Sequence, residues 1–218
     1  MNALPQFLGA AVGDIAGAFA IPGGNVMGLA VQGLFKKRLE QARNILLEEI
    51  RAGEKDALEA IEIDEVVAIV YRYMRAAQEG TAHVNLRLLA QVIAGQKKLT
   101  SLKADEFLYY ADLIASLRRE EIILLGCMQK HFQEPQHVMG SSQAAYEPQK
   151  LAQLELIPST FKTEDDFNSC ITALNRTGLV IGTSSYGGMM MYRLSPLMAE
   201  LSKLASFQDA LANKEDKK

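Results

Sequence analysis

The chain has 218 residues, which is enough for one large domain or two small ones. Its content of 49% apolar and 22% charged residues is typical of a globular protein and argues against extensive disorder, except in the tail 213–218. A net charge of −3 disfavours non-specific nucleic-acid binding, and two cysteines are too few for a secreted disulfide scaffold. We therefore expect a cytoplasmic protein.

The first 35 residues are apolar and rich in glycine, with Asp14 as their only charged side chain. Gly9, Gly13 and Gly17 stand four apart, so on a helix they would form a smooth ridge that allows close approach of another backbone. The segment Pro22-Gly23-Gly24-Asn25 divides the uncharged stretch into two pieces, each too short to cross a bilayer. The favoured interpretation is a pair of short core helices.

The alternative is a hairpin that self-associates or contacts a membrane. Lys36, Lys37 and Arg38 follow the apolar stretch directly, as basic residues do at a membrane boundary. The residues assigned to this contact are Gly9, Gly13, Gly17, Phe35, Lys36, Lys37 and Arg38. The chain would then be a cytoplasmic protein associated with a membrane through residues 1–35, and a homo-oligomer is the expected assembly.

Residues 36–116 are predicted to form a helical bundle. Apolar residues recur every three or four positions, as on one face of a helix, up to Ala52 and again over 64–78, 83–96 and 104–116. The stripe Phe35, Leu39, Ala42, Leu46 and Ile50 is one example. Gly53 and Gly80 are natural helix ends.

The last part, 117–212, is predicted to be a winged-helix-like domain. Helices are expected over 118–132, 151–156 and 163–177, with Thr163 as N-cap of the third and Gly178 after its end. Strands are expected at 179–181 and 189–194, joined by a turn over 182–188. Ser195-Pro196 opens a final helix. The predicted fold class is mainly α: a helical bundle or array followed by a winged-helix-like module with a two-stranded β-wing.

No catalytic, nucleotide-binding or metal-binding motif is recognisable, so we predict no catalytic residues, no metal and no cofactor. Cys127 and His131 lie four apart on one predicted helix, and His137 and Cys170 could complete a zinc set. Their spacing matches no standard zinc finger, and a buried structural thiol is the favoured interpretation of Cys127. Paired carboxylates such as Glu120-Glu121 fall in first helical turns, where they compensate the helix dipole.

In a DNA-binding winged helix, the helix over 163–177 would enter the major groove. Glu164, Asp165 and Asp166 lie near its leading end and would repel phosphates. A basic surface would have to be assembled from distant positions, for which the candidates are Lys150, Lys162, Arg176, Tyr186 and Arg193. A dimeric DNA-binding transcriptional regulator is therefore the alternative function, and protein contact is favoured.

Two stretches carry a family resemblance. One is Phe107-Leu108-Tyr109-Tyr110-Ala111-Asp112-Leu113, followed by Leu117 and Glu121-Ile122-Ile123-Leu124. The other runs from Phe167 through Leu174 and Gly178-Leu179-Val180 to Tyr192-Arg193-Leu194-Ser195-Pro196. Together they resemble the abortive-infection alpha family over the C-terminal half of the chain. The resemblance implies a role in defence against phage, with no catalytic residues to assign.

The sequence thus predicts a non-enzymatic binding protein, related to phage defence or stress. Its helical N-terminal part would self-associate or contact a partner or membrane, and its winged helix would serve as a second interaction module. No small-molecule ligand is indicated.

Overall fold

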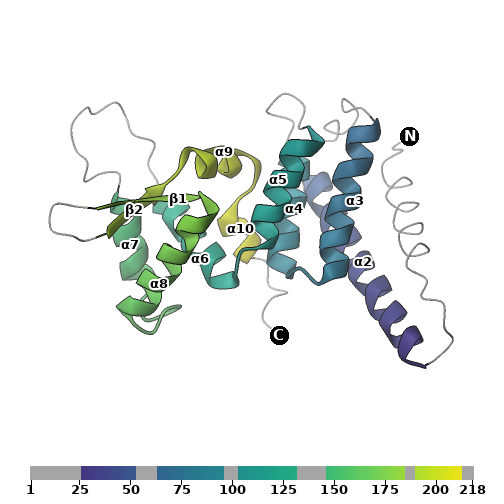
Figure 1. Ribbon diagram of the computed structural model, residues 1–218, viewed down its shortest axis with the longest axis horizontal. Helices are drawn as coiled ribbons and strands as arrows, with labels where there is room; N and C mark the ends of the chain where they lie inside the picture. The colour runs from purple at the N-terminus through teal and green to yellow at the C-terminus, as the bar shows by residue number, and fades with distance from the viewer. Residues whose placement is uncertain (1–25, 53–62, 96–102, 132–145, 185–189, 213–218) are drawn as a thin grey trace. The chain divides into compact units, whose positions relative to one another are not determined.

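The computed structural model describes residues 26–52, 63–95, 103–131, 146–184 and 190–212. The chain divides into two compact units, residues 1–116 and residues 117–218. Helices make up most of the described residues, and a two-stranded antiparallel sheet occurs in the second unit (Figure 1). The predicted fold class is confirmed: a helical array is followed by a winged-helix-like module with a β-wing.

The first unit contains helices α2 (Val26–Ala52), α3 (Ile63–Glu79), α4 (His83–Ala94) and α5 (Ala104–Ala115). Helix α4 packs against α2 and α5, and α3 packs against the same two helices (Figure 1). The apolar stripes predicted from the sequence form the core of this unit; Leu39, Tyr73, Leu89 and Phe107 are among its fully buried side chains. Burial of such stripes is the main source of stability for helices of this length.

Helix α2 begins directly after the Pro-Gly-Gly-Asn segment and continues without interruption past residue 35. Phe35 and the basic residues that follow it therefore lie within a 27-residue helix and do not mark the start of a new element. Arg38 connects this helix to the end of α3, because its guanidinium Nη1 donates to the carbonyl of Gln78 at 3.1 Å. Gly80 follows α3 in a left-handed conformation, with φ of 92°.

The second unit begins with three helices, α6 (Arg119–His131), α7 (Glu147–Leu156) and α8 (Glu164–Leu174), the last extended by a 3-10 turn at Asn175–Thr177. Strands β1 (Val180–Ser184) and β2 (Met190–Leu194) pair in antiparallel register, with Val180 opposite Leu194. Helices α9 (Pro196–Leu204) and α10 (Phe207–Ala212) follow. The wing lies beside α7 and α8 in Figure 1, and both helices contact the sheet.

Local sequence signals account for these boundaries. Thr163 and Asp166 form a capping box, in which each side chain accepts from the other residue's backbone N–H at 3.1 Å. Gly178 ends the 3-10 turn with φ of 72°, a conformation that favours glycine. Ser195 caps α9 by accepting from the backbone N–H of Met198, and Pro196 occupies its first turn.

Three details of the predicted second unit were wrong. Helix α7 starts at Glu147, four residues before the predicted start, and carries Pro148 in its first turn. Strand β1 continues to Ser184, so Gly182 is a strand residue and not part of the turn. A further helix, α10, follows α9. The first two differences have a physical reason: proline is compatible with a first helical turn, and Gly182 lies opposite Tyr192 in the sheet.

The glycine at position 182 makes room for that tyrosine ring. A Cβ on Gly182 would lie 2.9 Å from Tyr192 Cε1, which is closer than side chains tolerate. Tyr192 connects the wing to two helices: its hydroxyl hydrogen-bonds with Thr172 on α8 at 2.9 Å, and its backbone N–H donates to Gln149 on α7 at 2.6 Å. The wing is therefore an integral part of the second unit.

Candidate interaction surfaces

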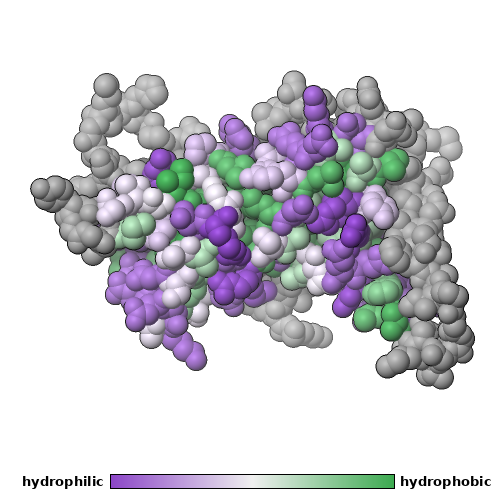
Figure 2. Space-filling model, viewed as in Figure 1, coloured by the Kyte–Doolittle hydropathy of each residue, from purple (hydrophilic) through white to green (hydrophobic). Residues whose placement is uncertain are grey.

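Helix α8 occupies the position of the third helix of the winged-helix-like unit. Its buried side is apolar, and its first turn presents Glu164, Asp165 and Asp166 to solvent. The rest of its exposed side consists of neutral polar residues up to Arg176 in the 3-10 turn. The area that α8 occupies in Figure 2 is mainly hydrophilic. A surface of this charge repels phosphate groups.

Arg176, which the sequence offered as a nucleic-acid contact, binds inside the unit. Its Nη1 donates to Glu121 Oε1 at 2.5 Å and its Nη2 to Glu121 Oε2 at 3.2 Å. The Glu121 side chain is 0% exposed, whereas that of Arg176 is 48% exposed. The guanidinium therefore neutralises a buried carboxylate of α6, and it cannot turn toward a phosphate without leaving that charge poorly compensated.

Arg118, the residue before α6, supports the same carboxylate. Its backbone N–H donates to Glu121 Oε2 at 2.8 Å, and its guanidinium lies 3.4 Å from Oε1. Burial acts to raise the pKa of Glu121, but the hydrogen bonds and charges of Arg176 and Arg118 outweigh it and leave the pKa below its ordinary value. Glu121 thus has a structural role beyond compensation of the helix dipole.

The remaining nucleic-acid candidates are dispersed. Lys150 is exposed on α7 and Lys162 is exposed just before α8, while Arg193 is half-buried on β2 opposite Ile181. Tyr186 lies outside the described residues. Within the part of the chain that the structure describes, these residues lie on α7, in the loop before the acidic start of α8 and on β2.

The residues assigned from the sequence to self-association or membrane contact are only partly described. Gly9, Gly13 and Gly17 lie outside the described residues. Phe35 is half-buried and Lys36 and Lys37 are exposed on α2. None of the helices in the described ranges is long and apolar enough to cross a membrane.

A different surface of the first unit exposes large apolar side chains. Val67 and Tyr71 are one turn apart on α3 and are 44% and 47% exposed, and Tyr109 on the adjacent α5 is 53% exposed. Between the two helices, Arg72 Nη2 lies 2.5 Å from Asp112 Oδ1 in an ion pair whose arginine is 17% exposed and whose aspartate is 74% exposed. We call the surface formed by Val67, Tyr71, Arg72, Tyr109 and Asp112 the α3–α5 face.

Sequence reasoning missed the α3–α5 face, although one signal for it exists. Phe107, Ala111 and Ile114 define the buried side of α5, and Tyr110 falls on that side with 3% exposure. Tyr109 lies one residue, or about 100°, away from Tyr110 and so faces solvent. Extending the periodicity to both tyrosines would have identified Tyr109 as the exposed one.

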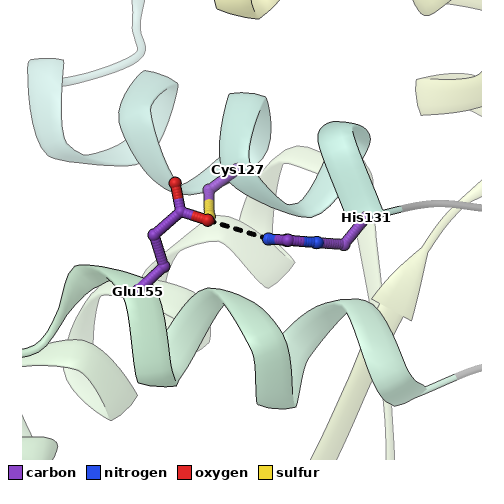
Figure 3. A group of neighbouring side chains, drawn as sticks. All are labelled: Cys127, His131 and Glu155. Carbon is purple, nitrogen blue, oxygen red and sulfur yellow. Dashed lines mark hydrogen bonds and ion pairs between the residues drawn. The ribbon is translucent and has the colours of Figure 1, made fainter.

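The second unit contains a cluster of potential metal ligands. Cys127 and His131 project from α6 and Glu155 from α7, and their ligand atoms all lie within 4.8 Å of one another (Figure 3). His131 Nε2 lies 2.9 Å from Glu155 Oε2, and Lys130 Nζ is 2.9 Å from both oxygens of that carboxylate. Burial and the adjacent Glu155 raise the pKa of Cys127 to about 11, whereas Lys130 and His131 lower the pKa of Glu155.

The prediction that Cys127 is buried is confirmed, with 7% exposure. Of the other two residues considered with it, Cys170 lies on α8 and is not part of the cluster, and His137 lies outside the described residues. Burial and the charge of Glu121 raise the pKa of Cys170 to about 11. Glu155 was not considered. It follows Cys127 by 28 positions on another helix, so no sequence motif connects the two.

Comparison with known proteins gives no match. A scan against protein-family models finds no matching family, and searches of curated proteins and of solved structures find no matching protein.

Proposed function

We propose that this chain is a non-enzymatic, cytoplasmic binding protein that self-associates through its helical unit and uses its winged-helix-like unit for contact with protein. The observation that carries the proposal is the α3–α5 face. Aromatic residues, tyrosine among them, are enriched at the buried centres of protein interfaces relative to the rest of the protein surface. Here three large side chains are exposed on the two adjacent helices that the Arg72–Asp112 ion pair joins.

A second copy of the chain is the partner that this face fits best. A two-fold dimer brings the same surface of both copies together, so the surface must complement itself. The α3–α5 face carries one positive and one negative side chain, Arg72 and Asp112, beside its apolar residues. In a two-fold arrangement the exposed Asp112 of each copy can approach the exposed part of Arg72 in the other, while the tyrosines pack against apolar surface.

The charges of the second unit favour protein as the partner of the winged-helix-like module. The start of α8 is acidic and Arg176 is held by Glu121, so the side that would approach DNA offers little positive charge in the described residues. A mobility-shift assay at low salt tests the alternative of a DNA-binding regulator. We expect no retardation of duplex DNA, and retardation that disappears in Lys150→Ala/Lys162→Ala would favour that alternative.

Multi-angle light scattering on the full chain tests self-association. We expect the mass of a dimer that dissociates on dilution. The double variant Tyr71→Ser/Tyr109→Ser should be monomeric at the same concentration, because each central aromatic residue typically contributes about 2 kcal/mol, or about 30-fold in Kd. The matched control is Leu154→Ser, which removes a side chain that is 71% exposed in the second unit. A monomeric wild-type chain, or a double variant that still dimerises, would contradict the proposal.

The resemblance to the abortive-infection alpha family extends the proposal to phage defence. Bacteria that express the wild-type chain should then form fewer phage plaques than bacteria that express Tyr71→Ser/Tyr109→Ser at equal levels. Equal plaque numbers in both strains and in a strain without the chain would remove the defence role and leave the dimer proposal to the scattering experiment.

A further inference from the structure

The cluster on α6 and α7 brings together three side chains of the types that bind transition metals. Cys127 and His131 lie one helical turn apart on α6, so both point to the same side of the helix. Glu155 reaches the same space from α7, and the three side chains point toward one another in Figure 3. This arrangement lies outside the α3–α5 face and is independent of the function proposed above.

The donor atoms suit Zn²⁺. A thiolate sulfur, an imidazole nitrogen and a carboxylate oxygen are its three protein ligand types, at about 2.3, 2.0–2.1 and 2.0–2.2 Å from the ion. Tetrahedral geometry at those bond lengths places ligand atoms about 3.3–3.6 Å apart. The atoms here lie within 4.8 Å of one another, and His131 Nε2 is 2.9 Å from Glu155 Oε2. Small rotations of side chains are therefore sufficient to enclose the ion.

The burial of the three residues gives the site one closed side and one open side. Cys127 belongs to the core, whereas the side chains of His131 and Glu155 are 21% and 42% exposed. An ion can therefore enter from solvent past the histidine and the glutamate. Three protein ligands leave a fourth tetrahedral position, which the open side allows water to fill.

Lys130 competes for the carboxylate. Its ammonium lies 2.9 Å from both oxygens of Glu155 and is 52% exposed, so it can swing into solvent without leaving a buried charge. Its positive charge would oppose a cation at the site. Metal binding must therefore replace the contacts of Glu155 with Lys130 and His131.

We propose that Cys127, His131 and Glu155 bind Zn²⁺, which clamps α6 to α7 in the winged-helix-like unit. On binding, the Cys127 thiol loses its proton to solvent, a sulfur–zinc bond forms and one H⁺ is released. Neutral His131 coordinates through Nε2, and Glu155 coordinates through one carboxylate oxygen. The metal joins two helices that are connected by residues 132–146 and so stabilises their packing.

Titration of the purified, reduced full chain with Co²⁺ and then Zn²⁺ tests the site. Co²⁺ should give the ligand-field bands of a four-coordinate ion and a thiolate-to-cobalt charge-transfer band, and one equivalent of Zn²⁺ should abolish both. Zn²⁺ should also raise Tm. His131→Ala and Glu155→Gln should each weaken Zn²⁺ binding tenfold or more, because loss of even an indirect contact to a ligand costs about 10–100-fold.

Two control variants show whether the charge-transfer band and the Zn²⁺ affinity come from this site or from another thiol or a damaged fold. Cys170→Ser removes the other buried thiol and should leave the charge-transfer band intact. Lys130→Met should tighten Zn²⁺ binding several-fold, since it removes the competing cation, and general damage to the fold would not have that effect. The proposal is overturned if wild type gives no charge-transfer band, if Cys127→Ser keeps it, or if Lys130→Met weakens binding.

Discussion

An arginine–carboxylate contact of 2.5 Å occurs in each unit, and the two contacts differ in which partner is buried. In the second unit, the Glu121 side chain is 0% exposed and Arg176 covers it from the 3-10 turn. In the first unit, the Asp112 carboxylate is 74% exposed, whereas the side chain of its partner Arg72 is 17% exposed. Equal distance does not mean equal energy, because the buried carboxylate depends on its partner and the exposed one is solvated by water.

The two units also differ in the charges that they leave at the surface. The winged-helix-like unit places a basic residue next to its third helix and binds it to an interior carboxylate, which leaves an acidic surface. The helical unit leaves the aspartate of its ion pair exposed, on helices that also carry the exposed Tyr71 and Tyr109. A winged-helix-like fold therefore does not by itself indicate DNA as the partner. The charges that remain at its surface determine whether DNA or protein can bind there.

The largest effect is expected at the buried pair. Arg176→Ala should lower the free energy of unfolding by about 2 kcal/mol, because it removes two hydrogen bonds to a buried charge. Arg118 still contacts Glu121, so the loss should stay below the roughly 3–5 kcal/mol typical of an unpaired buried ion. Urea unfolding of the variant and wild type measures the difference. A change within experimental error would show that Glu121 is adequately solvated without Arg176.

Acid should weaken the same contact. The pKa of Glu121 is lowered in the folded chain from its ordinary value of 4.5. Its stabilising contribution is therefore complete above pH 4.5 and is lost as the pH falls through the lowered pKa of the folded state. Unfolding curves recorded over this range should show a steeper loss of stability in wild type than in Arg176→Ala. Parallel losses in the two proteins would contradict this assignment.

A smaller effect on the free energy of unfolding is expected at the buried hydroxyl of Tyr73 in the first unit. Burial raises the pKa of Tyr73, whose hydroxyl donates to the carbonyl of Ala42 at 2.9 Å. Tyr73→Phe should cost about 1 kcal/mol, since a buried carbonyl loses one hydrogen bond. Tyr71→Phe, at an exposed position, is the matched control and should change stability by less than about 0.5 kcal/mol. Equal effects of the two substitutions in thermal unfolding would overturn this distinction.

The smallest effect on stability is expected at Asp112. Asp112→Ala should change the free energy of unfolding by about 0.5 kcal/mol, because an ion pair whose carboxylate is 74% exposed contributes little. The same substitution should weaken dimerisation, since the α3–α5 face then loses its negative charge. Urea unfolding below the dimer Kd measures the first quantity, and dilution followed by light scattering measures the second. A stability loss as large as that of Arg176→Ala would contradict the claim that the exposed Asp112 depends less on its arginine than the buried Glu121 does.

Features encoded locally were predictable from the sequence, and features that depend on tertiary packing were not. The stripe through Leu39 and Leu46, the cap at Thr163 and the glycine at position 178 each depend on neighbouring residues, and all are found as predicted. Gly182 was placed in a turn because its partner Tyr192 lies ten positions away across the sheet.

The candidate sites show the same limit. Arg176 and Glu121 are 55 positions apart, and only their packed helices bring them together. Cys127 and His131 share a helix face that the sequence shows, but their third neighbour, Glu155, comes from α7. Side chains that are brought together by different elements have no characteristic spacing, and the metal-ligand cluster was missed for that reason.

Cross-linking within the dimer tests the central claim most directly. Asp105 is exposed on α5 one turn before Tyr109, and both natural cysteines are buried, so Asp105→Cys provides one reactive thiol next to the α3–α5 face. Glu147→Cys, exposed on α7, is the control. With a short bis-maleimide, we expect rapid formation of covalent dimers of Asp105→Cys, slow formation with Glu147→Cys, and loss of the fast reaction when Tyr71→Ser is added. Equal rates for both cysteines, unaffected by Tyr71→Ser, would contradict self-association through this face.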